Sequence, residues 1–521
     1  MKRRLLSAFL AVMMVLTMAP VAFAADDAEN TVGDTGSSES APAKTLQQQV
    51  DEEANGSTVT LDKDYSENIV IKSGKNITLD LGSNTLTNNG GDTITVELGA
   101  TLTVTGNGES ADEDGSAGTV DNTTHQKADI VNNGTVILNG GWYLRSQETG
   151  VDANTSGGNS YYNILNHGEM TINNDTVVMQ EGKFSSLIVN GYYDYNGVKN
   201  KGERNQYIEG TNQAAPKLTI NDGFFSGGIN TIKNDDNAEL VICGGVFGNV
   251  TQAVVQNNNV AEIHGGTFNA TDHHAVENNH YEGNYNKGSV TITDGNFTGA
   301  LYTTAGATWN ITGGTFTADP SAYLAKDYKI EMVGSAYGVV PKSDAVAQNG
   351  EKTFVSLQNA INDAKDNDTI TLLKDVDLGN TVTVANKTVT LNMAGKTIYN
   401  TKGLWDSKPN AWSLISVREN GNLTITGDGT LKAKADDCYA LDTQEESAKL
   451  TVENGTVIGN ISAIYASLGD VIINGGNYSI QQLNPNNVQD EYGLTINCYD
   501  QHYKDKTAKI TVTGGYFVHF N

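Results

Sequence analysis

Cysteine, proline and basic side chains are all scarce in this sequence of 521 residues. The 3 cysteines, Cys243, Cys438 and Cys498, are far apart and odd in number, so the sequence indicates neither a disulfide framework nor a cysteine-based zinc site. The 7 prolines exclude collagen and proline-rich disorder, although glycine occurs 56 times. A formal charge of −28 excludes the basic surface on which nucleic-acid binding depends.

Long hydrophobic runs are absent after the N-terminus. Residues 1–24 combine a basic start, an apolar run from Leu5 to Met18, and the small residues Ala22 and Ala24 in a cleavage-site pattern, which predicts a secretory signal peptide. The run is shorter than the roughly 20 residues that span a bilayer. We therefore expect a secreted, extracellular protein, associated with the cell wall in one version of this hypothesis, and no membrane insertion after signal removal.

The dominant feature of the remaining chain is a repeat. An alternating apolar strand leads into two turn residues, usually glycine, and then an aromatic residue. The copies are VILNGGWY (136–143), LTINDGFF (218–225), LVICGGVF (240–247), AEIHGGTF (261–268), VTITDGNF (290–297), WNITGGTF (309–316), VIINGGNY (471–478) and ITVTGGYF (510–517). One coil of about 21 residues buries too little apolar surface to offset its conformational entropy. The coils must therefore stack, which predicts a parallel β-solenoid.

A second element, upstream of the turn, ends in asparagine. Asn132, Asn166 and Asn257 each stand eight residues before the first turn position of their coil. A shared position in successive coils predicts that the side-chain amides stack as a ladder and satisfy polar groups at a buried bend. We interpret these asparagines as structural.

The same plan occurs twice. A polar segment, 25–43, is predicted to be a disordered linker, and a first β-helix module follows at 44–342. After a linker at 343–351, a second module spans 352–521 and ends directly after a repeat turn, so we expect it to be truncated. Each module starts with a short amphipathic segment that predicts a helix capping the open end of the stack.

The helix-then-strand start Phe354–Ile361, the passage Ile370–Leu372, the G-G-x-F turns and the closing Asp319–Tyr323 carry a family resemblance. They resemble the right-handed parallel β-helix of pectate-lyase-like proteins, in the form found in repeat-rich secreted and surface proteins of Gram-positive bacteria. The resemblance covers nearly all of 44–521 and implies an all-β solenoid. It implies little about activity, because one fold hosts many functions.

Enzymes similar to this family cleave acidic polysaccharides, and a lyase site of that kind needs carboxylates that hold calcium and a basic residue that takes a proton. Beyond the signal peptide the only arginines are Arg145, Arg204 and Arg418, on separate coils, and the family's lyase and hydrolase motifs are missing. We therefore assign no catalytic residue and no cofactor. A calcium ion stays open as an alternative.

The densest set of candidate metal ligands is local. It comprises Asp272, His273, His274, Glu277 and His280. In the repeat alignment His274 takes an outward position that Gln252 takes one coil earlier. A solvated polar turn is the main interpretation, and a metal site is the alternative.

Insertions between the coils concentrate aromatic residues. These candidate ligand-binding residues are Tyr161, Tyr162, Tyr192, Tyr193, Tyr195, Trp405 and Trp412. Flat rings beside asparagine and aspartate suit sugars, which offer an apolar face and hydroxyl groups. The alternative is that these rings only pack their own loops onto the solenoid.

Together these features predict a secreted or cell-surface adhesin or binding scaffold that recognises glycans or surface proteins. The first alternative is a polysaccharide lyase or glycoside hydrolase with a non-standard site on the solenoid flank. The second is a purely structural surface stalk.

Overall fold

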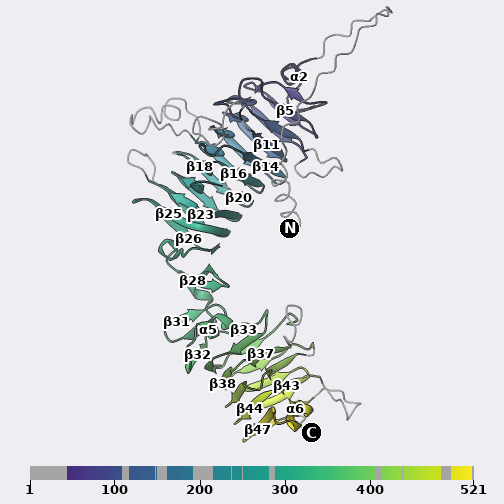
Figure 1. The fold of residues 1–521 in the computed structure, drawn as a ribbon, viewed down its shortest axis with the longest axis vertical. Helices are drawn as coiled ribbons and strands as arrows, with labels where there is room; N and C mark the ends of the chain where they lie inside the picture. Colours follow the sequence, from purple (N-terminus) through teal and green to yellow (C-terminus); the bar gives the residue numbers. More distant parts are fainter. Residues whose placement is uncertain are drawn as a thin grey trace, which may run out of the picture. The chain divides into compact units, whose positions relative to one another are not determined.

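The computed structural model describes residues 44–107, 117–146, 148, 161–191, 215–235, 237–248, 250–280, 288–404, 412–436, 438–482 and 494–518. The predicted signal peptide and the linker at 25–43 lie outside these residues. Within them, both modules are stacks of parallel strands (Figure 1). The predicted all-β solenoid of two tandem modules is therefore confirmed.

Each coil of the first module contributes to three faces. Face 1 contains β1 (Ser57–Thr60), β4 (Asn76–Asp80), β7 (Thr101–Thr105), β10 (Thr135–Asn139), β13 (Glu169–Ile172), β16 (Lys217–Ile220), β19 (Glu239–Ile242), β22 (Val260–Ile263), β24 (Ser289–Ile292) and β26 (Thr308–Ile311). Face 2 contains β2 (Tyr65–Ser66), β5 (Thr85–Thr87), β8 (Thr119–Asp121), β11 (Gly141–Arg145), β14 (Thr176–Gln180), β17 (Phe224–Ser226), β20 (Val246–Gly248) and β27 (Thr315–Phe316). Face 3 contains β3 (Ile69–Ile71), β6 (Ile94–Val96), β9 (Ile130–Asn132), β12 (Ile164–Asn166), β15 (Ile188–Asn190), β18 (Asn230–Asn234) and β21 (Ala253–Asn257). The long strands β23 (Thr267–Asn278) and β25 (Asn296–Thr303) run through faces 2 and 3.

The second module repeats this arrangement. Its face 1 contains β32 (Asp368–Leu372), β35 (Thr388–Asn392), β38 (Asn422–Thr426), β41 (Lys449–Val452), β44 (Gly469–Ile473) and β47 (Ala508–Val512). Its face 2 contains β33 (Val376–Asp377), β36 (Thr397–Tyr399), β39 (Thr430–Lys432), β42 (Thr456–Gly459), β45 (Asn477–Ile480) and β48 (Tyr516–Phe517). Its face 3 contains β34 (Val382–Ala385), β37 (Ser413–Arg418), β40 (Tyr439–Thr443), β43 (Ser462–Ala466) and β46 (Ile496–Cys498). The helix α6 (Asp500–Lys504) connects β46 to β47.

The alternation of apolar and polar residues determines which side chains enter the core. In β10, Val136 and Leu138 are fully buried, whereas the intervening Ile137 is only partly buried. Inward residues of successive coils join into one continuous hydrophobic cluster in each module. Stacking therefore supplies the apolar contacts that a single coil lacks.

Short helices cover the start of each module, as the sequence predicts. The helix α2 (Leu46–Glu52) begins with a capping box formed by Thr45 and Gln48 and buries Leu46 and Val50. The helix α5 (Leu357–Asp363) is capped by Ser356 and buries three apolar side chains. None of the described helices has the length and apolar character that a bilayer-spanning helix requires.

Antiparallel pairs occur where the first module ends and the second begins. The strands β28 (Tyr328–Val333) and β29 (Ala336–Pro341) form a hairpin that pairs with β27, and the short helices η1 (Ser321–Tyr323) and η2 (Lys342–Asp344) flank it. The strand β30 (Ala347–Asn349) pairs with β31 (Lys352–Phe354) and β32. The segment 343–351, predicted as a linker, thus includes a strand of the second module's face 1.

The repeated G-G-x-F turns position a column of phenylalanine rings inside the first module. The rings stack almost parallel, with centroids 4.6 to 5.0 Å apart, and belong to Phe225, Phe247, Phe268, Phe297 and Phe316. The second turn glycine is needed because its φ is positive: Gly266 has φ +106°, and a Cβ there would lie 3.2 Å from the Gly245 carbonyl. The turn motif therefore fixes both the bend and the buried ring after it.

The structure contains the predicted asparagine ladder and extends it. Each buried amide nitrogen donates to the side-chain oxygen of the next asparagine at 2.7 to 3.0 Å, through Asn132, Asn166, Asn190, Asn234, Asn257 and Asn278. The same nitrogens also donate to backbone carbonyls of face 1, for example from Asn132 to Glu169 at 2.9 Å. The ladder thus satisfies buried polar groups where face 3 turns into face 1.

Candidate functional site

Polar side chains replace apolar ones on the outside of face 3, where β18, β21, β23 and β25 pair. Lys233, Gln256, Glu277 and Tyr302 occupy the same outward register position on these four strands. One strand earlier, on β15, the position holds Val189. The composition of the flank therefore changes abruptly within the first module.

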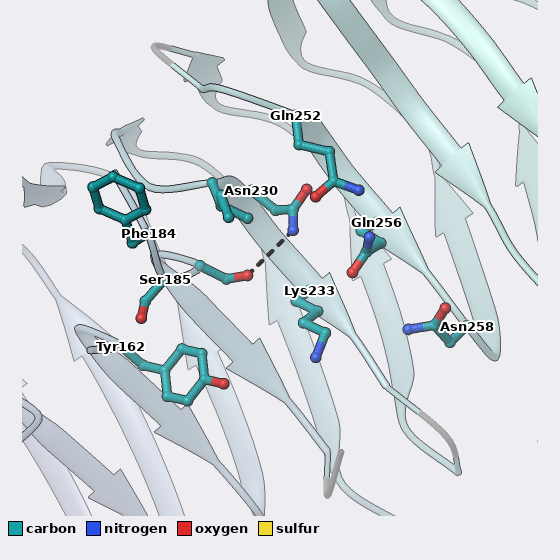
Figure 2. A pocket seen from close by; sticks show the side chains of 10 residues that line it. Tyr162, Phe184, Ser185, Asn230, Lys233, Gln252, Gln256 and Asn258 are labelled. Atoms are coloured by element: carbon teal, nitrogen blue, oxygen red, sulfur yellow. Dashed lines mark hydrogen bonds between the residues drawn. The ribbon is translucent and has the colours of Figure 1, made fainter. Parts of the chain in front are cut away.

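A hollow of about 280 Å³ opens beside this row (Figure 2). It is lined by Tyr162, Phe184, Ser185, Ser186, Ile229, Asn230, Lys233, Gln252, Gln256 and Asn258. We call it the face-3 hollow. Its size is close to the lower end of the range, about 300 to 1,000 Å³, that is typical of small-molecule sites.

A buried carboxylate behind the hollow orients two of the lining amides. Glu277 is 4% exposed, and its Oε2 accepts hydrogen bonds from Gln252 Nε2 at 3.0 Å and from Gln256 Nε2 at 3.2 Å. Its Oε1 lies 2.7 Å from Nδ1 of His274. The carboxylate is therefore held by three side chains, and each of the two amide nitrogens uses one of its two N–H groups to bind it.

A second buried carboxylate orients the third amide. Asp235 is fully buried; its Oδ1 accepts from Asn258 Nδ2 at 3.1 Å, and its Oδ2 lies 3.4 Å from Nζ of Lys233. Asn258 is 1% exposed, and its Oδ1 accepts no hydrogen bond from any described residue. An unsatisfied buried oxygen in the wall of a hollow is the kind of atom that a ligand donor would satisfy.

Aromatic rings form the opposite part of the wall. Phe184 is 41% exposed, and in Figure 2 its ring lies on the same side of the hollow as Tyr162, across from Gln256 and Asn258. Beside the row, Tyr302 is 44% exposed and stacks on His274 with 5.0 Å between the ring centroids. The hollow thus combines apolar ring surface with oriented amides, which is the combination that sugars require.

The structure places only some of the predicted ligand-binding aromatics at this site. Tyr162 lines the hollow, and Tyr161 packs against it with 5.2 Å between the ring centroids; burial raises the pKa of Tyr161. Trp412 lies in the second module, just before β37, and is 39% exposed. The remaining candidates, Tyr192, Tyr193, Tyr195 and Trp405, lie outside the described residues.

The predicted metal ligands do not converge on one point. His274 and Glu277 pair with each other, whereas Asp272 and His273 are exposed on β23. His280 lies past the end of the strand, and its backbone N–H donates to Thr304 Oγ1 at 2.5 Å. Among the residues that the structure describes, no group of three or more histidine, cysteine, aspartate or glutamate side chains is arranged to hold a metal ion.

A separate group of buried charges lies in an earlier coil. Arg145 Nη2 pairs with Glu148 Oε1 at 2.6 Å, and Glu148 Oε2 lies 2.9 Å from Nδ1 of His125. Asp129 is fully buried, and burial, followed by the charge of Asp121, raises its pKa well above the usual value. Arg145 and Glu148 pair inside the solenoid, and none of these groups lines the face-3 hollow.

Sequence reasoning missed most of the hollow. Phe184, Asn230, Lys233, Gln256 and Asn258 were not predicted as site residues. A usable signal was present in the aligned segments VVQNN and AVENN, where Gln256 and Glu277 share an outward position that is apolar in earlier coils. Comparison with family models and with curated proteins found no match for this chain.

Proposed function

We propose that the protein is a secreted glycan-binding scaffold of the adhesin type and that the face-3 hollow is its ligand site. The observation that carries this proposal is the lining of the hollow: exposed aromatic surface from Phe184 and Tyr162 faces three amides whose orientation buried carboxylates fix. A sugar ring has one apolar face and a rim of hydroxyl groups, and this wall offers a partner for each.

The shape of the site favours binding over cleavage. Glycoside hydrolysis uses two carboxyl groups that reach the glycosidic bond. Here Glu277 and Asp235 lie behind Gln256 and Asn258, and both are nearly or fully buried. The amides, not the acids, face the ligand position. A depolymerisation assay with and without calcium tests this distinction, because sustained product release would support the enzyme alternative.

Glycan binding by the full-length protein tests the proposal directly. We expect binding on a glycan array, followed by calorimetry on the best ligand, to weaken about tenfold in Tyr162→Ala and in Phe184→Ala, because each change removes a stacking ring. Tyr503→Ala is the matched control, since this ring is 64% exposed on α6 of the second module. Equal binding by all four proteins would place the ligand elsewhere.

A further inference from the structure

The amides that line the face-3 hollow are held in fixed orientations by buried carboxylates. The side-chain nitrogens of Gln252 and Gln256 donate to Glu277, and that of Asn258 donates to Asp235. Each amide therefore keeps its carbonyl oxygen, as well as one N–H, for the ligand. No hydrogen bond from a described residue reaches Oδ1 of Asn258, although this oxygen is buried. In Figure 2 the oxygen of Gln256 points toward Lys233, while its nitrogen points the other way.

The carboxylates also strengthen these acceptors. An amide that donates to an ionised group is polarised, so its oxygen becomes a better acceptor than that of an isolated amide. This effect applies to Gln252 and Gln256 through Glu277, and to Asn258 through Asp235. The site therefore prefers ligands with strong donors, such as hydroxyl and ammonium groups.

The charge around the hollow selects between those donors. The charge of Lys233 is matched by Asp235 at 3.4 Å, whereas Glu277 contacts two neutral amides and one histidine. The whole chain carries −28, which repels uronic acids and sulfated sugars and attracts cations. An ammonium group would satisfy the amide oxygens and interact favourably with the carboxylate behind them.

On the basis of the proposed function, we infer that the face-3 hollow binds amino sugars that carry a free ammonium group. The ring stacks on Phe184 and Tyr162, and the ammonium group donates to the amide oxygens of Gln256 and Asn258. An N-acetylated sugar has lost the positive charge, and with it the attraction to the carboxylate of Glu277. Acidic sugars are excluded by charge.

Calorimetry on the full-length protein with three oligosaccharides of equal length tests this inference. The probes are a β-linked glucosamine oligomer, its N-acetylated form and a galacturonic acid oligomer. We expect the glucosamine oligomer to bind about tenfold more tightly than the acetylated one, and the galacturonic acid oligomer to bind most weakly. The preference is expected to shrink as salt is raised, because the charge contribution is screened.

Two variants locate the source of the preference. Glu277→Gln removes the charge behind the amides, and Gln256→Met removes one acceptor at similar size; in each, we expect the ratio of the two affinities to fall toward one. Glu262→Gln is the matched control, because it removes one negative charge from face 1, where Glu262 is 51% exposed, and is expected to keep the ratio. Thermal unfolding confirms that each variant is folded.

The outcomes separate this inference from the proposed function. If both glucosamine forms bind equally, or the acetylated or acidic oligomer binds more tightly, and Tyr162→Ala still weakens binding, the amino-sugar inference is overturned while glycan binding stands. If both Glu277→Gln and Gln256→Met keep the tenfold preference, the amides are not its source and the inference is again overturned. If no oligosaccharide binds and the array shows no ligand, the proposed function fails as well.

Discussion

The two modules build the same coil from different side chains. On face 2, the later coils of the first module have an inward column of phenylalanines, from Phe225 to Phe316. Its earlier coils have Tyr65, Leu86, Val120, Tyr143 and Val178 at the same register position. The register-equivalent column of the second module holds Ile398, Leu431, Val457, Tyr478 and Phe517. The coil therefore requires an inward apolar side chain at this position but does not require a ring.

The turn from face 3 to face 1 differs in the same way. Where the first module has its asparagine ladder, the second has Val384, Val417, Thr443, Ala466 and Cys498. The ladder occurs at tight and at longer turns, since two residues separate Asn132 from the next strand and four separate Asn234 from it. At the tight turn, Oδ1 of Asn132 accepts from the backbone N–H of Gly134 at 2.9 Å. After Val417 the turn is longer, with Glu419 and Asn420 at positive φ. The corner therefore forms with the amide ladder in much of the first module and without it at these positions of the second.

The outer side of face 3 also carries different side chains in the two modules. The register positions of Ala253, Gln256 and Glu277 correspond in the second module to Tyr439, Asp442 and Tyr465. The rings of Tyr439 and Tyr465 pack with 4.8 Å between their centroids. The second module therefore carries rings at the two register positions that hold Ala253 and Glu277 in the first.

The largest contrast is expected for the aromatic column. Phe268→Ala removes a fully stacked ring between Phe247 and Phe297, and we expect it to lower the free energy of unfolding by about 3 to 5 kcal/mol. Val457→Ala, at the equivalent place in the second module, removes fewer buried carbons and is expected to cost about 2 kcal/mol. Denaturant unfolding, with hydrogen exchange to locate the change, measures both. Equal losses would show that stacking adds nothing to the first module.

The ladder is expected to give the next largest contrast. Asn234→Leu removes one buried hydrogen-bond partner from the Asn190 nitrogen and one from the Asn257 oxygen, so we expect a loss of about 2 to 4 kcal/mol. Thr443→Val, at the equivalent corner, removes a buried hydroxyl that has no hydrogen-bond partner among the described residues, so it is expected to be neutral or stabilising. Hydrogen exchange of backbone amides in the coils on either side of each substitution measures the loss of stability. A comparable loss in both variants would argue against the ladder as the source of the stability.

These contrasts show why the coil could be predicted and the site only in part. The G-G-x-F turns and the spacing of Asn132, Asn166 and Asn257 repeat in sequence, and each repeat predicts the same local contacts. Asn190 and Asn234 were missed because an insertion or a longer turn changes their spacing to the following strand. Inward residues can be predicted from the sequence because every coil must bury apolar side chains at the same positions.

The face-3 hollow follows no such repeated requirement. It depends on which residues of different coils become neighbours, as when Gln252, just before β21, and Gln256 of β21 meet Glu277 of β23. Phe184 comes from a connection between β14 and β15, and no repeat position predicts where its ring lies. Tyr162 was predicted from its aromatic character alone. Sites made by contacts between insertions and outward positions therefore need the structure.

Each module also buries an aspartate, and here the expected contrast depends on pH. Burial raises the pKa of both Asp129 and Asp442. Because the folded protein then holds the proton more tightly than the unfolded chain does, the favourable contribution is complete below the ordinary value of 3.8 and is lost as the pH rises toward the folded-state pKa. We expect Asp129→Asn to raise the unfolding temperature at pH 7.5 and to lose this advantage near pH 3.5.

Asp442→Asn is the matched variant in the second module. Gln444 Nε2 donates to Asp442 Oδ2 at 2.6 Å, and this bond favours the ionised form and opposes the effect of burial. The gain at pH 7.5 is therefore expected to be smaller than for Asp129→Asn. Unfolding temperatures at both pH values test this order. A lower unfolding temperature for Asp129→Asn at pH 7.5 would show that the buried aspartate is ionised and paired.

The smallest effect is expected where the two modules agree. The outward turn position of face 1 carries an exposed row in each: Asn173 Nδ2 donates to Asn139 Oδ1 at 2.7 Å in the first, and Asn474 accepts from Thr513 Oγ1 at 2.7 Å in the second. These bonds are as short as those of the buried ladder. Because they are exposed, however, water can replace a partner that a substitution removes. We expect Asn173→Ala and Asn474→Ala each to change the free energy of unfolding by less than about 0.5 kcal/mol. A loss for Asn173→Ala that matches Asn234→Leu would mean that the stacking of amides stabilises the coil without burial.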